Sequence, residues 1–364
     1  MRVTLVTPGF PPELGGVEAH TGHLVRELTA LGVGMRVLTA RRGLRRPLSE
    51  TRDGVQITTY PAWRTRVMSI SPGLLFAALR ASRDADLIHV HSYHATCGFA
   101  TLIGFRAPVV FTPHYHGGGH STGAVLLHRG YRFVGKLVFR AAHAVICVSR
   151  AERDLVVRDF PATATRTGVV PNGVDLAALR AAEPFPGEPR TIVSLGRLEP
   201  YKRVATLLRA LVDIPPDVQL VVIGDGSQLE ELRELTGDLR VAERVRFTGP
   251  LSTTDVHRWL RTARVLVSLS EHEAFGMAPV EAAAAGAGVV LSDIPAHREI
   301  TADHLGTMAT LTGTRPSDVA AAVTARLDAT ERTEADVPGW ARIARQTLAV
   351  YHSVRRTDRK DSTP

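Results

Sequence analysis

Short runs of apolar residues recur along the chain and are separated by segments with helical periodicity. In the first half these runs are nearly continuously apolar and rich in Val, Ile and Leu, which is typical of parallel strands buried on both faces. Two of the intervening segments, residues 17–31 and 72–81, have the spacing of helices. This alternation predicts a doubly wound parallel sheet. The predicted strands are residues 3–7, 35–38, 55–58, 87–90, 109–111 and 144–148.

A second series of the same kind begins at residue 191. A chain of 364 residues is too long for one ordinary core, so we expect an α/β protein of two tandem doubly wound, Rossmann-like domains facing across a cleft. Ligands of such sheets bind beyond the carboxyl ends of the strands, which makes the cleft the expected site. The predicted strands of the second series are residues 191–195, 219–223, 245–247, 265–267 and 289–291.

A stretch rich in proline and glycine separates the two series. We expect an N-terminal domain at residues 1–175, a linker at 176–190 and a C-terminal domain at 191–339. The last helical stretch, residues 340–354, is expected to cross back to the first domain. The basic tail at 355–364 is expected to be disordered.

The composition fits a globular protein, and it narrows the choice of partners. No apolar run is long enough to span a membrane, and the first strand starts at Met1, so we expect no signal peptide. The only cysteines, Cys97 and Cys147, lie in apolar surroundings, which predicts reduced, buried thiols and a cytoplasmic location. The net charge of +8 favours an anionic substrate, or contact with the inner face of a membrane, and a general enrichment in arginine explains it equally well. Aromatic residues make up only 5%, which disfavours nucleic acid.

The most informative stretch is residues 268–286, which follows an apolar strand and leads into a short alanine-rich helix. Pro279 suits the first turn of this helix, and Gly286 suits its C-terminal end. The amides of residues 275–278 are then free donors at a helix N-terminus, where a phosphate group binds readily. Glu273 and Glu281 flank these amides.

Two carboxylates beside an anion site make sense when the ligand also carries hydroxyl groups. In a nucleoside diphosphate sugar, one glutamate would accept hydrogen bonds from the sugar, the other would accept them from the ribose, and the amides would hold the diphosphate. The E-x7-E spacing alone fits equally well a Glu281 that only favours the helix dipole and a solvated Glu273. The longer pattern, Glu-x-Phe-Gly after a strand and then Pro279 before small residues, favours the ligand.

Two further loops carry residues suited to a diphosphate. Arg197 and Lys202 follow the strand at 191–195, on the same predicted sheet edge as Glu273, where they would neutralise the diphosphate. Gly15-Gly16 starts the helix after the first strand and would let the backbone approach an anion, although a plain turn explains the pair as well. No G-x-G-x-x-G fingerprint occurs, which disfavours a dehydrogenase.

Three histidines, His114, His116 and His120, follow a buried strand of the first domain. A zinc site would need a fourth ligand at a familiar spacing, and no cysteine is near in sequence, so we expect no metal. We expect His114 to contact the substrate, with a structural role at the strand end as the alternative. The D-x-D tripeptide at 84–86 precedes its strand, so we interpret it as polarity at a helix end rather than as a metal site.

With these residues in place, nearly the whole chain resembles a retaining glycosyltransferase of family 4, a family with the GT-B fold. One departure is Tyr115, because many members carry aspartate directly after the histidine; this residue and the glycines at 117–119 concern the acceptor side. The motifs that carry the resemblance are Gly15-Gly16-Val17-Glu18, Thr112-Pro113-His114, Val170-Pro171-Asn172-Gly173-Val174-Asp175, Gly196-Arg197 to Lys202, Gly224-Asp225-Gly226 and Glu273 through Glu281.

The resemblance implies a role for each motif residue. His114 would lie beside the anomeric carbon, Arg197 and Lys202 would offset charge on the departing nucleoside diphosphate, and Glu273 would hold the sugar. The backbone near Leu251 would face the base. The family requires no metal and no other cofactor. The implied donor-binding residues are Gly15, Gly16, Arg197, Lys202, Leu251, Glu273, Phe275, Gly276, Met277, Ala278 and Glu281.

We therefore predict transfer of a hexose-type sugar from a nucleoside diphosphate sugar to an acceptor hydroxyl, with retention at the anomeric carbon. No carboxylate nucleophile stands out, so we expect front-face departure, in which the leaving phosphate takes the acceptor proton. A nucleotide-sugar epimerase on the same fold and a non-catalytic nucleotide-sugar-binding protein are the alternatives. The donor base, donor sugar, linkage, oligomeric state and acceptor (small molecule, lipid or glycan) stay open.

Overall fold

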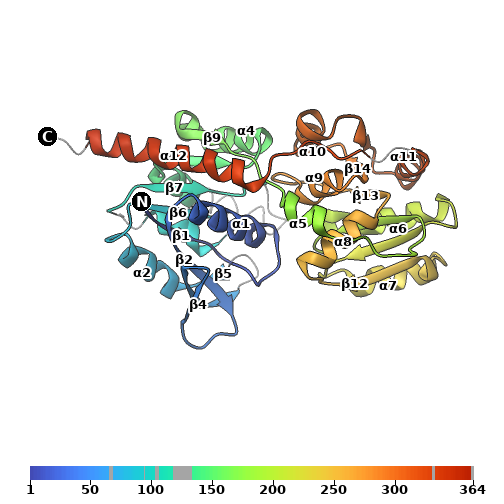
Figure 1. The fold of residues 1–364 in the computed structure, drawn as a ribbon, viewed down its shortest axis with the longest axis horizontal. Helices are drawn as coiled ribbons and strands as arrows, with labels where there is room; N and C mark the ends of the chain where they lie inside the picture. Colours follow the sequence, from blue (N-terminus) through green and yellow to red (C-terminus); the bar gives the residue numbers. More distant parts are fainter. Residues whose placement is uncertain (65–68, 94, 103–105, 118–132, 330–332, 362–364) are drawn as a thin grey trace. The chain divides into compact units, whose positions relative to one another are not determined.

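The computed structural model describes residues 1–64, 69–93, 95–102, 106–117, 133–329 and 333–361. The chain divides into two compact units (Figure 1). Unit 1 consists of Met1–Asn172 and the chain from Trp340 onward, and unit 2 is Gly173–Gly339. Each unit is a sheet of mainly parallel strands with helices between them, so the predicted α/β class is confirmed.

The sheet of unit 1 has the strand order β3-β4-β2-β1-β6-β7-β8-β9, with β5 paired to β4. From β4 to β9 the strands run parallel. The order of winding reverses between β1 and β6, and ligands bind at such switch points. The strands are β1 (Arg2–Val6), β2 (Gly34–Arg42), β3 (Leu48–Arg52), β4 (Val55–Arg64), β5 (Ser69–Ile70), β6 (Leu87–His91), β7 (Val109–Thr112), β8 (Ala144–Cys147) and β9 (Thr167–Val169).

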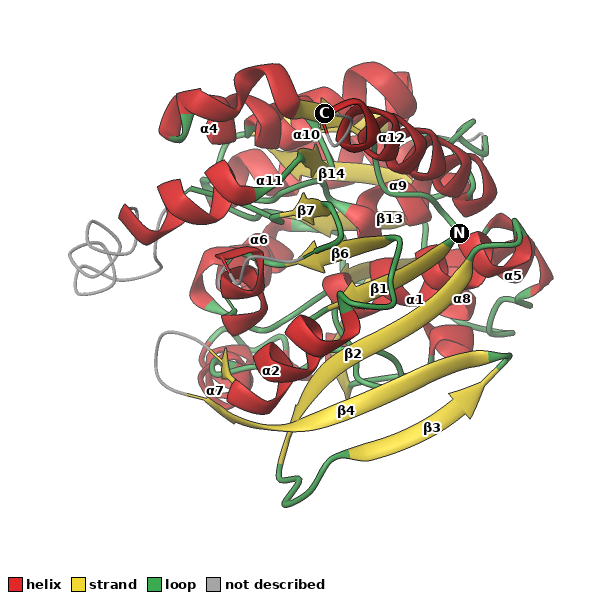
Figure 2. Cartoon of the chain, turned by 90° about the vertical axis from the view of Figure 1, so that its left-hand side faces the viewer, coloured by secondary structure: helices red, strands yellow, loops and turns green. Residues whose placement is uncertain are grey.

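Both edges of this sheet depart from the prediction, and β9 at one of them was not predicted. The strands β3 and β5 were not predicted, and both pair antiparallel with β4. Figure 2 shows β3 beside β4 at the sheet edge. The residues of β3 are almost all exposed and mostly polar, so no apolar run marks it. An antiparallel strand at the edge of a parallel sheet is common, because an edge strand needs no crossover helix.

The last helix of the chain belongs to unit 1, where it packs against α1. Its buried residues include Trp340, Ile343 and Tyr351. The helix continues to residue 361, so the prediction that it ends at 354 and gives way to a disordered tail is wrong for 355–361. An ion pair of 3.3 Å between Arg355 Nη2 and Asp86 Oδ1 secures the added turn. The helices of unit 1 include α1 (Gly16–Ala30), α2 (Pro72–Ala81), α4 (Arg150–Asp159) and α12 (Trp340–Asp361).

The sheet of unit 2 is parallel throughout, with the order β12-β11-β10-β13-β14-β15. All five predicted strands are present, and β15 was not predicted. The winding reverses between β10 and β13, which is the switch point of this unit. The strands are β10 (Thr191–Leu195), β11 (Gln219–Ile223), β12 (Val245–Gly249), β13 (Val265–Ser268), β14 (Gly288–Ser292) and β15 (Ala309–Thr312).

Helices cover the sheet of unit 2, and one of them lies in the segment expected to be a linker. Residues 176–190 are part of unit 2. They contain α5, which is capped by the Asp175 carboxylate and packs against α8. Phe185 also contacts the Trp259 ring of α8, at 4.6 Å between centroids. The helices are α5 (Leu176–Ala181), α6 (Val204–Ala210), α7 (Leu229–Asp238), α8 (Thr253–Thr262), α9 (Met277–Ala284), α10 (Pro295–Ile300) and α11 (Pro316–Asp328).

Candidate functional site

The loops after β10 and β13 lie side by side at the switch point of unit 2 because these two strands are neighbours in the sheet. Lys202 lies on the first loop and Glu273 on the second, 71 positions further along the chain. Their side chains form an ion pair between Lys202 Nζ and Glu273 Oε1. The expectation that these loops share one sheet edge is therefore confirmed, and their direct pairing is new.

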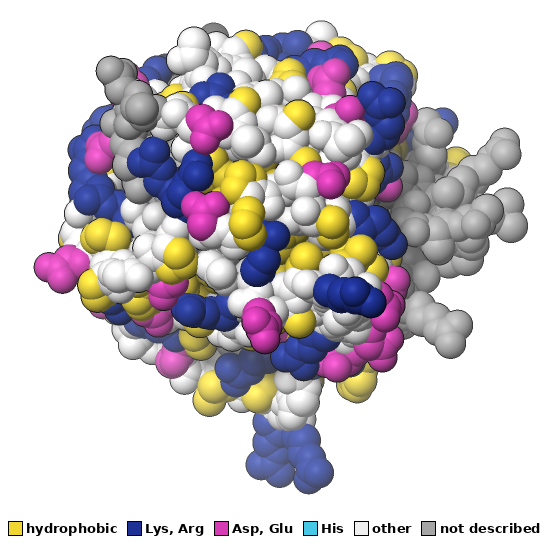
Figure 3. All heavy atoms as spheres, turned by 90° about the vertical axis from the view of Figure 1, so that its right-hand side faces the viewer, with side chains coloured by type: hydrophobic (Ala, Val, Ile, Leu, Met, Phe, Trp, Pro, Cys, Tyr) yellow, Lys and Arg dark blue, Asp and Glu magenta, His cyan; other side chains and the backbone are white. Residues whose placement is uncertain are grey.

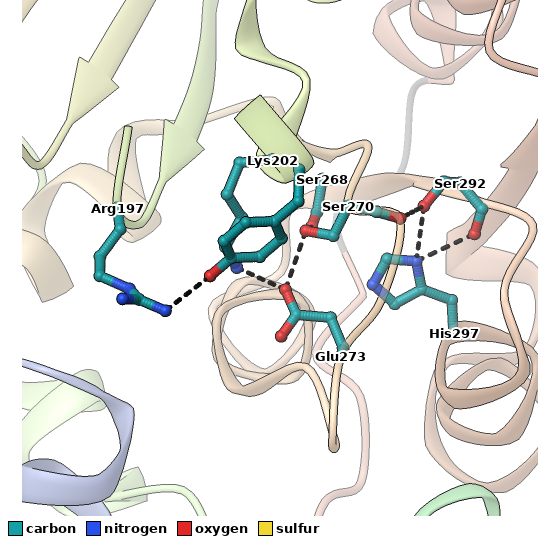
Figure 4. A network of polar contacts seen from close by, with 8 residues as sticks. Arg197, Lys202, Ser268, Ser270, Glu273, Ser292 and His297 are labelled. Carbon is teal, nitrogen blue, oxygen red and sulfur yellow. Dashed lines mark hydrogen bonds and ion pairs between the residues drawn. The ribbon is translucent and has the colours of Figure 1, made fainter. Parts of the chain in front are cut away.

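Glu273 also accepts a hydrogen bond of 2.8 Å from Ser270 Oγ, on the same oxygen that Lys202 contacts (Figure 4). Burial alone would raise the pKa of Glu273, but the Lys202 ammonium and the Ser270 hydroxyl lower it below its ordinary value. The group is therefore an ionised carboxylate that stays a fixed acceptor near neutral pH. About a fifth of each side chain of the pair is exposed, so both remain accessible to a ligand.

Arg197 is exposed, and its position depends on an aromatic side chain that the sequence reasoning missed. Its Nη2 donates to Tyr201 Oη at 2.8 Å, and the Tyr201 ring stacks on His272, with centroids 4.5 Å apart. The backbone joins the two loops as well, because Glu271 N donates to Tyr201 O at 2.9 Å. The loop that carries Glu273 therefore contacts the loop that carries Arg197 and Lys202, and these contacts fix the positions of both cations.

The helix α9 begins where the motif predicted. Gly276 precedes it with a φ of +103°, a conformation that favours glycine. Pro279 lies in the first turn, and Gly286, with a φ of +82°, ends the helix in the predicted way. The first amides of a helix have no partner within it, so the backbone from Met277 is ready to donate to an anion. Phe275 is a buried anchor of the loop.

Glu281 lies within α9, next to a second carboxyl group. Burial, with a contribution from the negative charge of Asp175, raises the pKa of Glu281 to about 7. Asp175 itself accepts a hydrogen bond of 3.2 Å from Ala178 N at the start of α5. Glu281 therefore changes charge near neutral pH, which the sequence did not predict.

Two glycines hold the loop after β11 close to the loop after β10. A Cβ atom at Gly224 would lie 2.0 Å from Gly196 O, and one at Gly226 would lie 2.4 Å from Leu198 O. The glycines of this motif thus permit close approach of two backbones. Leu251 follows β12, the next strand outward, so it lies at the same edge of the parallel sheet.

In unit 1, His114 lies two residues after the end of β7 with a φ of +49°, an uncommon value for a residue with a side chain. Its Nε2 lies 3.3 Å from His91 Nδ1, and its ring is 5.1 Å from that of His20. The Nδ1 of His20 contacts Asn172 Oδ1 at 2.7 Å. Burial, reinforced by the neighbouring imidazoles, lowers the pKa of His114 and His91 well below 6.5, so both rings are neutral at pH 7.

Within the part of the chain that the structure describes, these histidines are also the group whose arrangement most resembles a metal-binding site. Among the described residues, ring nitrogens of His20, His91 and His114 form a group within 4.8 Å of one another. Neutral imidazoles are suitable ligands for a transition metal, but three hydrogen-bonding histidines form the same cluster without one. Residues 118–120, and with them His120, lie outside the described residues.

Gly15 and Gly16 begin α1 as predicted, but the carboxylate of Glu18 lies against the loop. A Cβ atom at Gly15 would lie 2.2 Å from Glu18 Oε2, and one at Gly9 would lie 2.2 Å from Glu18 Oε1. A Cβ atom at Gly16 would meet nothing within 4 Å. The Glu18 carboxylate therefore lies against Gly9 and Gly15, so this loop carries an anion supplied by the chain itself.

The loop that carries His114 is fixed by Glu152, which the sequence reasoning also missed. Its two oxygens accept from Tyr115 N at 2.5 Å and from Val148 N at 2.6 Å. The Tyr115 hydroxyl donates to Asp159 Oδ2 at 2.6 Å. Burial raises the pKa of Glu152 to about 8 against the effect of the two amides.

The structure also bears on the predictions for the D-x-D tripeptide, the two cysteines and a membrane-spanning segment. Asp86 precedes β6 and accepts from Arg2 N at 2.7 Å, which agrees with a structural role for the D-x-D tripeptide. Cys97 and Cys147 are free and buried, as predicted. Over the described residues, no helix is long and apolar enough to cross a membrane. Basic and acidic side chains are interspersed over the face drawn in Figure 3.

Comparison with known proteins identifies the family. The model for glycosyl transferases group 1 matches residues 176–335, and that for Glycosyltransferase Family 4 matches residues 14–178. The chain is 30% identical over 399 positions to the alpha-maltose-1-phosphate synthase of Mycolicibacterium smegmatis, covering 97% of this chain and all of the relative. It is 31% identical over 328 positions to the phosphatidyl-myo-inositol mannosyltransferase of the same organism, covering 83% of this chain and 79% of the relative.

Solved structures share the fold over nearly the full length. Anabaena HepE in complex with UDP and glucose superposes with a TM-score of 0.72 at 19% identity, covering 99% of this chain and 100% of that one. Sucrose-phosphate synthase from Thermosynechococcus elongatus superposes with a TM-score of 0.70 at 20% identity, covering 98% and 99%. The chain belongs to the family 4 glycosyltransferases with the GT-B fold, and it is a glycosyltransferase.

Proposed function

We propose that this glycosyltransferase moves a hexose-type sugar from a nucleoside diphosphate sugar to an acceptor hydroxyl, with retention at the anomeric carbon and without a metal. The observation that carries the proposal is the arrangement at the switch point of unit 2. There the Lys202–Glu273 pair, the exposed Arg197 and the N-terminus of α9 lie on two adjacent loops. HepE, which shares the fold, has been solved with UDP-glucose.

Each group of this arrangement suits one part of the donor. The ammonium of Lys202, the guanidinium of Arg197 and the first amides of α9 are cationic or hydrogen-bond donors, which suits a diphosphate. Glu273 is an ionised acceptor, which suits sugar hydroxyls. The Glu281 carboxyl, one turn into α9, suits the ribose hydroxyls. The unit 1 residues His114, Gly15 and Gly16 stay predictions.

The proposed reaction balances without an enzyme nucleophile. The bond between the anomeric carbon and the diphosphate oxygen breaks, and the acceptor oxygen bonds to the same face of that carbon. The acceptor proton passes to the departing diphosphate, which leaves as the nucleoside diphosphate. Fixed positive charge from Lys202, Arg197 and the helix amides stabilises the negative charge that develops on the leaving group.

The acceptor proposed for a first test carries a phosphate group. The names of three relatives include alpha-maltose-1-phosphate, phosphatidyl-myo-inositol and D-inositol 3-phosphate. The net charge of +8 is compatible with such an acceptor. Suitable probes are α-glucose 1-phosphate, D-inositol 3-phosphate and phosphatidylinositol vesicles.

The test is a turnover assay with UDP-glucose and GDP-mannose, each with and without these acceptors and with EDTA present. We expect release of nucleoside diphosphate that depends on an acceptor, and an α-linked product by NMR. A converted donor sugar without acceptor would instead show an epimerase, and tight donor binding with no product from any acceptor would favour a binding protein.

A pair of variants connects the activity to the site. Lys202→Met should lower kcat/KM by about a hundred- to a thousandfold, as for the loss of one electrostatic contact in a transition state. The control is Arg209→Met, an exposed cation on the adjacent α6, which should keep normal activity. Normal activity in Lys202→Met would overturn the proposed site.

A further inference from the structure

His297 is a buried imidazole in unit 2 that no motif had singled out. It lies on α10, in the segment that follows β14, the strand next to β13. Its side chain is fully buried. Figure 4 shows its ring between Ser292 and the part of the site where Glu273 lies.

The hydrogen bonds of one ring nitrogen determine the tautomer. His297 Nδ1 lies 2.9 Å from Ser292 O, and a carbonyl oxygen only accepts, so Nδ1 carries the hydrogen. Ser292 Oγ lies 3.2 Å from the same nitrogen while donating its own hydrogen to Ser270 O at 2.5 Å. Burial lowers the pKa of His297 below 6.5, so the ring is neutral at pH 7. In this tautomer Nε2 has a lone pair and no hydrogen.

That lone pair has no partner. Within the described residues, His297 Nε2 is a buried atom that makes no hydrogen bond. The ring edge that contains it faces the start of α9, because a Cβ atom at Gly276 would lie 3.6 Å from His297 Cδ2, the carbon bonded to Nε2. In Figure 4 this side of the ring is turned toward the part of the network that contains Glu273.

An unpartnered acceptor in a folded protein carries a cost that a ligand can relieve. Buried polar groups are nearly always hydrogen-bonded, and an exception needs an explanation, such as a role in the chemistry of a site or a partner that binds there. The free protein has already stripped Nε2 of water, so a hydroxyl that reaches it gains a hydrogen bond without removing water from the protein atom. A phosphate oxygen has no hydrogen to donate, whereas a sugar hydroxyl does.

Building on the proposed function, we propose that His297 is a specificity-determining residue that accepts a hydrogen bond, through Nε2, from one hydroxyl of the donor sugar next to those bound by Glu273. The charged Glu273 carboxylate and the neutral His297 Nε2 would then accept hydrogen bonds from two neighbouring hydroxyls of the same sugar. A sugar that lacks the second hydroxyl leaves Nε2 without a partner and is bound more weakly.

The variants separate the two ring nitrogens. His297→Asn places an amide nitrogen near the position of Nδ1, where it can still donate to Ser292 O, and removes Nε2. His297→Gln places an amide group near the position of Nε2 instead. Arg298→Ala is the control on the same helix, because Arg298 is exposed and pairs with Asp293 at the surface.

The first experiment measures the Kd of UDP and of UDP-glucose by calorimetry, or of GDP and GDP-mannose if the protein prefers them. For His297→Asn we expect UDP-glucose to bind about tenfold more weakly, with UDP affinity unchanged within about twofold. His297→Gln should recover part of the loss, and Arg298→Ala should bind both ligands normally. Equal losses for UDP and UDP-glucose would indicate a phosphate contact and overturn the proposal.

The second experiment identifies the hydroxyl with donors in which one sugar hydroxyl at a time is replaced by fluorine, which cannot donate. In the wild type, one such replacement should weaken binding about tenfold, and in His297→Asn the same replacement should change nothing further. Parallel losses in both proteins at every position would overturn the inference while leaving the proposed function intact. If the wild type bound no member of a panel of nucleoside diphosphate sugars, the proposed donor class would fail and the inference with it.

Discussion

Glu281 should make unit 2 less stable as the pH rises from about 4.5 to about 7. Its folded-state pKa is about 7, raised from 4.5 by burial and then by the charge of Asp175. Between pH 4.5 and pH 7 the folded protein holds a proton that the unfolded chain has released, so the free energy of unfolding falls as the pH rises. The loss is absent below pH 4.5 and complete above pH 7.

Glu281→Gln removes this dependence because the amide keeps the shape of the protonated acid and cannot ionise. At 1.36 kcal/mol for each pH unit between the two pKa values, the ionised form costs about 3 kcal/mol. The variant should therefore be about 3 kcal/mol more stable than the wild type at pH 8, and less than about 1 kcal/mol more stable at pH 5.

Urea unfolding at pH 5 and pH 8 measures both values. Far-ultraviolet circular dichroism follows the unfolding, and the difference between the two proteins cancels the titration of all other groups. The control is Glu234→Gln, an exposed position on α7, which should change stability by less than about 0.5 kcal/mol at either pH. An equal gain for Glu281→Gln at pH 5 and pH 8 would refute the assigned pKa.

The same carboxyl group makes donor binding depend on pH if it accepts hydrogen bonds from the ribose in its ionised form. UDP-glucose is the suitable probe, because its bridging diphosphate does not titrate near neutrality. With a pKa of about 7 for Glu281, its Kd should rise about tenfold between pH 8 and pH 6. Glu281→Gln should bind more weakly with no such slope. A wild-type Kd that is flat over this range would exclude the ionised group as the ribose contact.

Four further substitutions test packing in the two units. Gly224→Ala should lower the free energy of unfolding by about 2–4 kcal/mol, because its Cβ would lie 2.0 Å from a backbone oxygen at a φ of +132°. By contrast, a Cβ at Gly237 on α7 would meet nothing within 4 Å, so Gly237→Ala should stabilise the protein by about 0.5–1 kcal/mol. Urea unfolding measures both changes. Tyr351→Phe removes the 2.7 Å contact with the buried His89 Nδ1 and should cost about 1 kcal/mol, seen as a lower Tm. Glu152→Gln leaves one of two buried amides without an acceptor and should lower the unfolding free energy by about 2 kcal/mol; a loss below about 0.5 kcal/mol would contradict its structural role.

The sequence predicts buried strands well because their signal is local. Residues 220–223 are apolar on both faces, and the predicted strand at 219–223 matches β11 residue for residue. β3 has the polar sequence Leu48-Ser-Glu-Thr-Arg, and its place is set by pairing with β4 rather than by burial. No periodicity marks such a strand, so its existence follows only from the three-dimensional sheet.

The sequence predicted which loops form the site, but it did not predict which side chains contact one another there. Strand order in a doubly wound sheet brings Lys202 and Glu273 to one edge, but whether the side chains meet depends on the backbone path of each loop. Tyr201 was missed because a tyrosine beside a lysine has no distinctive pattern. His297 had a usable signal: it follows β14, a strand of the same parallel series, and the rule that pointed to Glu273 applies to it equally.

The return of the chain to unit 1 has a consequence for the order in which the protein is made. Unit 2 is one continuous segment whose ends are joined, because Val174 N donates to Pro338 O at 3.0 Å and Val174 pairs with Gly339. A ribosome therefore completes unit 2 before it delivers α12, and until then α1 lacks the helix that covers it. Truncations before residue 340 should leave the α1 face of unit 1 uncovered and exposed to chaperones and proteases.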